Sequence, residues 1–185
     1  MISFKYLTML VLGAALTTAS PAINTARASS DAAAPYFAYG TGVNGLPLWY
    51  GDGVAYLGKF HPSNVTNSAN VTLTLSDKSI KTVVNKTNSA DPDVGSSLLY
   101  INTVSGAFSE VGFTNDSSTD EHTTTGFGLL GTMLVWENSK GDLDSSWYAE
   151  PVTEDQTVYK LLWNTDLVSS DTAVAVVLKK TPPPS

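Results

Sequence analysis

The chain has 185 residues, of which 42% are hydrophobic and 15% charged, and this balance suits one globular domain with a sizeable core. It contains no cysteine, which excludes disulfides, thiolate metal sites and cysteine nucleophiles. The formal net charge is −7 and Arg27 is the only arginine, so the chain is a poor partner for phosphate backbones and nucleic-acid binding is disfavoured.

The first 28 residues have the pattern of a secretory signal peptide. One positive charge, Lys5, precedes an apolar stretch at 6–16 that is too short to span a membrane. Small residues then offer cleavage after Ala19 or after Ala28. Loss of residues 1–28 would leave 8 basic and 17 acidic residues, a net charge of −9. The sequence therefore predicts a secreted product, extracellular or associated with the cell wall, with no membrane span in the mature chain.

The remainder is expected to form one domain. We expect a flexible lead-in at 29–35, a single β domain at 36–180 and a disordered tail at 181–185. Four N-x-Ser/Thr sequons predict an N-glycosylated product and place their segments at the surface. The sequon asparagines are Asn64, Asn70, Asn85 and Asn115.

The first half of the domain predicts two hairpins. Strands at 46–50 and 54–58 flank an Asp-Gly turn, which is a strong hairpin signal between aromatic and β-branched residues. The stretch 71–76 alternates apolar and polar residues and turns into a second strand at 80–86. Further along the chain, strands are expected at 97–104, 108–113, 147–150, 158–164 and 173–180.

The stretch 123–137 is the most continuous apolar run after the N-terminus. Gly126, Gly128 and Gly131 make a long helix through it costly. Its apolar residues do not alternate with polar ones, which is typical of a strand buried on both faces. We therefore expect it to be the central strand of the domain.

Taken together, about nine to ten short strands are separated by turn signals, and no convincing amphipathic helix is present. This pattern predicts an all-β fold, an antiparallel β-sandwich of jelly-roll or Ig-like type, or a closed antiparallel sheet.

Candidate catalytic and metal-binding residues are few. The only histidines, His61 and His122, lie in polar loops, and no G-x-S-x-G nucleophile motif occurs, so neither a metal nor another cofactor is predicted. A glycoside hydrolase or lyase would need a pair of carboxylates, for which Glu110, Glu137 and Glu150 are the candidates on or beside strands. An acidic residue at the end of a strand is the simpler interpretation of each.

Aromatic residues give the remaining signal. In adjacent pairs, one ring should point inward and the other outward, because side chains alternate along a strand. Outward rings can stack against the apolar faces of sugars unless a second layer of chain covers them. The candidate ligand contacts are Trp49, Tyr50, Trp136, Trp147 and Tyr148.

The signal peptide, the cysteine-free β domain with sequons and the YFAYGTG start at 36–42 resemble small secreted fungal surface proteins of unassigned function. The resemblance implies no catalytic residues. We therefore expect a secreted, non-enzymatic glycoprotein of the cell surface or wall that binds polysaccharide through exposed aromatic residues. Two alternatives stay open: a small glycoside hydrolase or lyase with a carboxylate pair, and an effector or structural protein whose partner is another protein.

Overall fold

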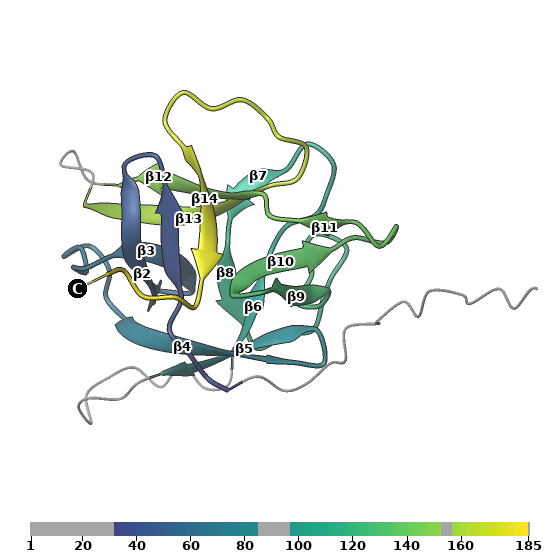
Figure 1. Ribbon diagram of the computed structural model, residues 1–185, viewed down its shortest axis with the longest axis horizontal. Helices are drawn as coiled ribbons and strands as arrows, with labels where there is room; N and C mark the ends of the chain where they lie inside the picture. The colour runs from purple at the N-terminus through teal and green to yellow at the C-terminus, as the bar shows by residue number, and fades with distance from the viewer. Residues whose placement is uncertain (1–31, 85–96, 153–156, 185) are drawn as a thin grey trace, which may run out of the picture.

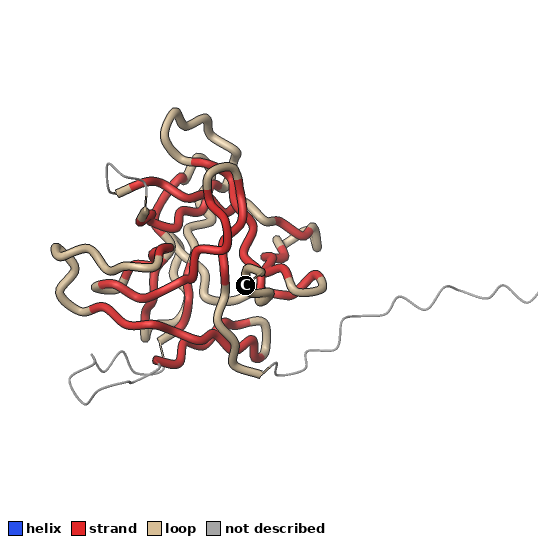
Figure 2. The backbone as a smooth tube through the Cα atoms, turned by 60° about the vertical axis from the view of Figure 1, so that its left-hand side comes forward, coloured by secondary structure: helices blue, strands red, loops and turns tan. Residues whose placement is uncertain are grey.

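The computed structural model describes residues 32–84, 97–152 and 157–184. These segments contain strands and loops but no helix, and fourteen strands form one antiparallel hydrogen-bonded sheet (Figures 1 and 2). The predicted all-β, antiparallel, sandwich-like class is confirmed, with more strands than expected. The strands are β1 (Phe37–Gly40), β2 (Val43–Gly51), β3 (Val54–Gly58), β4 (Ser68–Ser76), β5 (Ser79–Val84), β6 (Leu98–Tyr100), β7 (Phe108–Glu110), β8 (Gly112–Thr114), β9 (Phe127–Leu130), β10 (Met133–Glu137), β11 (Leu143–Asp144), β12 (Trp147–Pro151), β13 (Val158–Asn164) and β14 (Val174–Lys179).

The sheet closes on itself. Following the pairings from β1 through β2, β3, β13, β12 and β14 leads back to β1, so these strands form a ring. A second closed path runs from β2 through β4, β5, β6, β8 and β3 back to β2. The two rings share the β2–β3 hairpin. In Figure 1 the β4–β5 hairpin therefore crosses one end of the molecule while β12 and β13 cross the other.

A cluster of large aromatic side chains lies in the core. Trp147 and Trp163 are buried, with their ring centroids 4.7 Å apart and their planes at 73°. The Phe127 and Trp147 rings stack with their centroids 6.5 Å apart and their planes at 17°. The indole N–H of Trp147 donates to the Leu134 carbonyl oxygen at 3.0 Å, so its one polar atom is paired inside the core.

Both predicted hairpins in the first half of the domain are present. Asp52 and Gly53 have φ values of 46° and 89°, and Asp77 and Lys78 have values of 51° and 60°. Each pair forms a two-residue loop, between Gly51 and Val54 or between the ends of β4 and β5. Positive φ at both central residues is the hairpin geometry that matches strand twist.

The prediction of one central strand at 123–137 is wrong. This stretch forms a β9–β10 hairpin, in which Leu130 pairs with Met133 across a turn that begins at Gly131 with φ of 65°. The hairpin lies at the margin of the two closed strand paths. Its pairing with β14 consists of one residue pair, Met133 with Lys179. Apolar composition alone does not separate a buried strand from a tight hairpin, and the glycine at the turn is the residue that decides it.

The strand predicted at 108–113 is divided into β7 and β8. β7 pairs with β13, whereas β8 pairs with β3 and β6. Val111 lies buried between them, donating to the Leu161 carbonyl and accepting from the Ala55 N–H, each at 2.9 Å. This division brings β6 and β7 close enough to share one cleft.

The described ends of the domain are tied to the sheet. Ala34, in the predicted flexible lead-in, exchanges two backbone hydrogen bonds with Leu73, at 3.0 and 2.9 Å. In the predicted disordered tail, the Thr181 carbonyl accepts from the Tyr39 hydroxyl at 2.8 Å, and Pro183 packs against the backbone of β2. The signal-peptide prediction concerns residues outside the described ranges. Within these ranges no helix is long and apolar enough to cross a membrane.

Candidate binding cleft

A cleft of about 440 Å³ opens beside β6, β7 and the loop that follows β8. Its volume falls within the roughly 300–1,000 Å³ of small-molecule sites. The cleft combines two aromatic rings, two carboxylates, an amide and a hydroxyl. The lining residues are Tyr100, Asn102, Ser109, Glu110, Glu121 and His122.

Tyr100 and His122 form one wall of this cleft. Tyr100 lies opposite Gly112 in the β6–β8 pair. A Cβ at Gly112 would lie 2.7 Å from the Tyr100 ring, so the absence of a side chain at this position leaves room for the ring. A bridge between Ile101 and Thr123 aligns the neighbouring residues. The Tyr100 and His122 rings consequently lie 4.7 Å apart at 46°.

Two buried polar atoms of the cleft residues have no hydrogen-bond partner among the described residues. They are His122 Nε2 and Ser109 Oγ. The other ring nitrogen of His122 is paired, because Nδ1 lies 3.0 Å from Thr119 Oγ1. Buried polar atoms are seldom unpaired in folded proteins. Other buried polar atoms of the described residues are unpaired as well, among them the indole nitrogens of Trp49 and Trp163, and all of these atoms are enclosed by the protein. Ser109 Oγ and His122 Nε2 therefore do not by themselves mark a ligand contact.

Glu110 and Lys160 form an ion pair beside the cleft. The hydrogen bond to Glu110 raises the pKa of Lys160, with burial acting against it, so Lys160 stays cationic at neutral pH. Burial raises the pKa of the Tyr100 phenol, and the negative charge of Glu110 raises it further. Tyr100 is therefore a neutral hydroxyl that can donate a hydrogen bond but is a poor base.

The structure separates the three predicted carboxylates. Glu110 lines the cleft, Glu150 lies opposite Lys160 in the β12–β13 pair, and Glu137 is ion-paired with Lys78 at 2.9 Å. The second carboxylate of the cleft is Glu121, which is not among the three predicted carboxylates. In the sequence, Glu121 is distinguished only by its position beside His122 in an acidic loop. This position does not indicate that the loop lies near β7.

Two of the predicted ligand-binding aromatics are enclosed. Trp147 lies in the core and is 0% exposed, and Trp49 is also 0% exposed. Neither can contact a ligand in this structure, which contradicts their expected role. Their neighbours Tyr50 and Tyr148 are half-buried, with rings against Phe113 at 5.5 Å and Phe108 at 5.2 Å. None of these four aromatics lines the cleft.

Trp49 points away from the main core and is covered by a second layer. Its ring stacks on Tyr56 at 4.6 Å and on His61 at 4.2 Å. Burial lowers the pKa of His61, partly offset by a hydrogen bond to the Asn70 side chain, which raises it. The loop that carries His61 is fastened to the Asp52 carboxylate, which accepts from the backbone N–H groups of 66 and 67 at 2.8 Å.

Asp52→Asn should loosen this loop. The two backbone N–H groups lower the pKa of Asp52 below its ordinary 3.8, so the carboxylate stabilises the loop above that pH. The contribution is lost as the pH falls through the lowered value. The protection factors for hydrogen exchange at Thr66 and Asn67 should be lower in the variant at neutral pH, and in the wild type they should fall only under more acidic conditions. The exposed Asp171→Asn provides the control, and unchanged exchange in Asp52→Asn would contradict this role.

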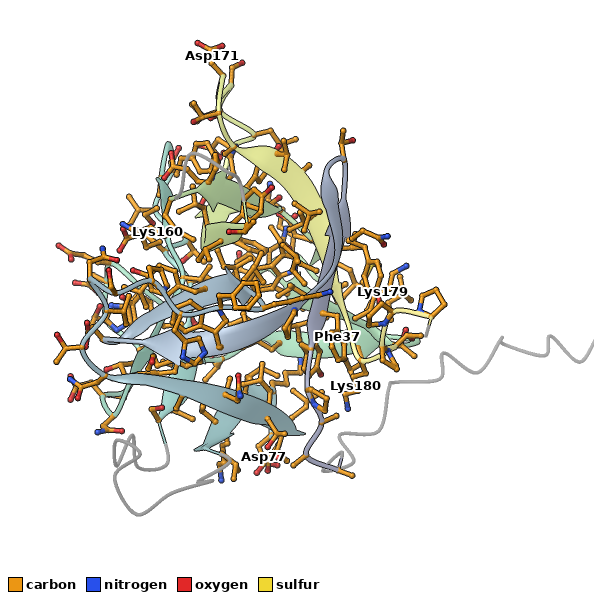
Figure 3. The ribbon with its side chains drawn as sticks, turned by 90° about the vertical axis from the view of Figure 1, so that its left-hand side faces the viewer. Phe37, Asp77, Lys160, Asp171, Lys179 and Lys180 are labelled. Atoms are coloured by element: carbon orange, nitrogen blue, oxygen red, sulfur yellow. The ribbon has the colours of Figure 1, made fainter. Side chains whose placement is uncertain are left out.

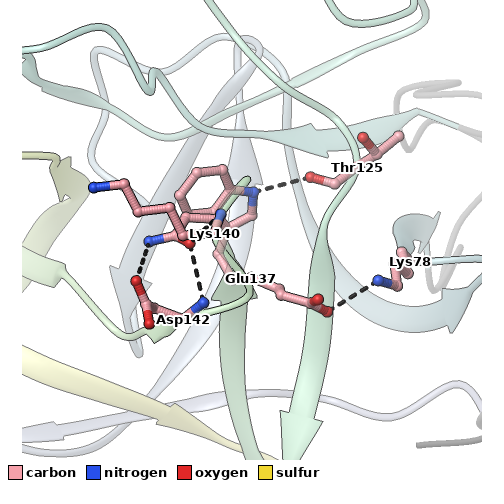
Figure 4. A network of polar contacts seen from close by, with 7 residues as sticks. Lys78, Thr125, Glu137, Lys140 and Asp142 are labelled. Carbon is pink, nitrogen blue, oxygen red and sulfur yellow. Dashed lines mark hydrogen bonds and ion pairs between the residues drawn. The ribbon is translucent and has the colours of Figure 1, made fainter. Parts of the chain in front are cut away.

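The fifth aromatic, Trp136, also has its polar atom paired within the protein. Its indole N–H donates to the Thr125 carbonyl at 3.0 Å, beside the ion pair between Glu137 and Lys78 (Figure 4). The turn at 138–142 is closed by its own hydrogen bonds. The end of β10, which carries Trp136 and Glu137, is therefore not part of the cleft.

Three of the four sequon asparagines lie within the described ranges, and all three are exposed: Asn64, Asn70 and Asn115. Asn85 lies outside these ranges. In the same part of the chain, no group of three or more histidine and carboxylate side chains is arranged to hold a metal ion. Comparisons with protein-family models, curated proteins and solved structures give no match for this chain.

Proposed function

We propose that this chain is a secreted, non-enzymatic glycoprotein of the cell surface or wall that binds carbohydrate in the Tyr100–His122 cleft. The observation that carries the proposal is the convergence of the Tyr100–His122 aromatic wall with the polar side chains of Asn102, Glu110 and Glu121 in one cleft. The signal-peptide pattern and the sequons support the location.

Carbohydrate suits this lining better than an apolar ligand. A sugar ring presents an apolar C–H face, which packs on an aromatic ring, and hydroxyl groups around its edge. The hydroxyls need donors and acceptors, and the cleft offers Glu110 and Glu121 as acceptors and the Asn102 amide as a donor. A polar lining with few apolar side chains leaves a purely hydrophobic ligand little surface to bury.

A glycoside hydrolase is the second candidate, because two carboxylates, Glu110 and Glu121, line one cleft. The ion pair to Lys160 favours binding over catalysis, since it occupies Glu110. Hydrolysis of a polysaccharide panel by the wild type, lost in both Glu110→Gln and Glu121→Gln, would support the enzyme instead.

Tyr100→Ala should weaken carbohydrate binding by about tenfold or more, because it removes the ring on which the sugar would lie. Binding is measured on a glycan array and then by calorimetry with the ligands that the array retains. Tyr148→Ala is the matched control, since this half-buried tyrosine lies outside the cleft. An array without any retained glycan would refute the proposed function, and equal losses in the two variants would move the site elsewhere.

A further inference from the structure

We propose that the cleft selects amino sugars that carry a free ammonium group, as in deacetylated hexosamine oligosaccharides. This inference rests on the proposed function and specifies its ligand class. It is carried by the charge balance of the cleft together with its aromatic wall.

The cleft has more negative than positive charge. Glu110 and Glu121 line it, and no lysine is among its lining residues. Lys160 stands beside it and neutralises Glu110 through their ion pair. Lys179 and Lys180 lie on the other side of the molecule from Lys160 (Figure 3).

Glu121 is therefore the carboxylate without a compensating charge. Its side chain is exposed and forms no ion pair with any other described residue. A ligand ammonium group placed beside Glu121 would make a charge-assisted hydrogen bond, which is stronger than a bond between neutral groups. A sugar carboxylate in the same position would be repelled, and no arginine is present in the described ranges to bind it.

The rest of the lining distinguishes an amino sugar from a simple polyamine. The Tyr100 and His122 rings, 4.7 Å apart, provide a surface for a sugar ring. The Asn102 amide belongs to the same lining and can bond to the hydroxyl groups of a sugar. A flexible aliphatic amine would pair with Glu121 but has neither an apolar ring face for the aromatic wall nor hydroxyl groups for Asn102.

The test is calorimetry on the purified full chain with three probes at pH 6 and low salt: a glucosamine tetramer, an N-acetylglucosamine tetramer and tetralysine. The glucosamine tetramer should bind about tenfold more tightly than either of the others. Glu121→Gln should remove most of this preference, while Glu137→Gln, a matched change outside the cleft, should retain it. Added salt should weaken the binding of the glucosamine tetramer more than that of the neutral N-acetylglucosamine tetramer.

Each other outcome overturns the inference. Equal affinity for the two sugar tetramers would refute amino-sugar selection but leave carbohydrate binding intact. Tetralysine binding as tightly as the glucosamine tetramer would show that charge alone is recognised. An unchanged preference in Glu121→Gln would exclude this carboxylate as the ammonium contact. The glycan array described above tests the proposed function separately, because it includes neutral and acidic glycans.

Discussion

Trp147→Ala should lower the free energy of unfolding by about 3–5 kcal/mol, the range for aromatic truncation in a core. Trp147 is 0% exposed and its ring packs against those of Phe127 and Trp163. Its removal would leave a cavity beside these two rings and would also leave the Leu134 carbonyl without the indole donor. The loss is measured by urea denaturation followed by circular dichroism, because the substitution also changes tryptophan fluorescence.

The neighbouring Tyr148→Ala is the control for this prediction. Tyr148 is half-buried and contacts Phe108 edge to face, so its truncation should cost about 1–2 kcal/mol. If Trp147→Ala does not fold, Trp147→Phe should still show a measurable loss, since it keeps an aromatic ring but removes the hydrogen bond. Equal losses at Trp147 and Tyr148 would contradict the inward orientation of Trp147.

Local sequence signals predicted the hairpins and strands that depend on local chemistry. The strand predicted at 158–164 has the bounds of β13, and the Asp-Gly turn between β2 and β3 is present. In such segments, turn residues and β-branched or aromatic residues favour the same structure. The error at 123–137 arose where composition was uniformly apolar and one glycine determined the topology.

The cleft was less accessible to sequence reasoning. Tyr100 and Glu110 are near in sequence, but Glu121 and His122 reach the same place through a loop and the Ile101–Thr123 bridge. Pairings of this kind join residues whose separation in the chain carries no periodic signal. The aromatic pairs gave the correct alternation at Trp147, whereas the layer that covers Trp49 depends on the loop fastened by Asp52.

Gly112→Ala should disturb both the fold and the cleft. A Cβ at this position would lie 2.7 Å from the Gly53 carbonyl oxygen and 2.7 Å from carbons of the Tyr100 ring. The first neighbour is backbone of the β2–β3 turn and cannot move freely, so we expect a loss of about 1–3 kcal/mol in stability from overpacking. The second neighbour is the cleft wall, and displacement of this ring should weaken carbohydrate binding by about the same factor as Tyr100→Ala.

Gly128→Ala separates these effects from a general glycine effect. A Cβ there meets only Val135 Cγ2, at 3.9 Å, which is an ordinary contact. This variant should be neutral or slightly more stable, because alanine restricts the unfolded chain. In the double variant Tyr100→Ala/Gly112→Ala, the loss of stability should be smaller than the sum of the losses in the two single variants. The reason is that Tyr100→Ala removes one of the two groups that a Cβ at Gly112 would meet. Strict additivity, together with normal binding by Gly112→Ala, would mean that Gly112 does not set the position of Tyr100.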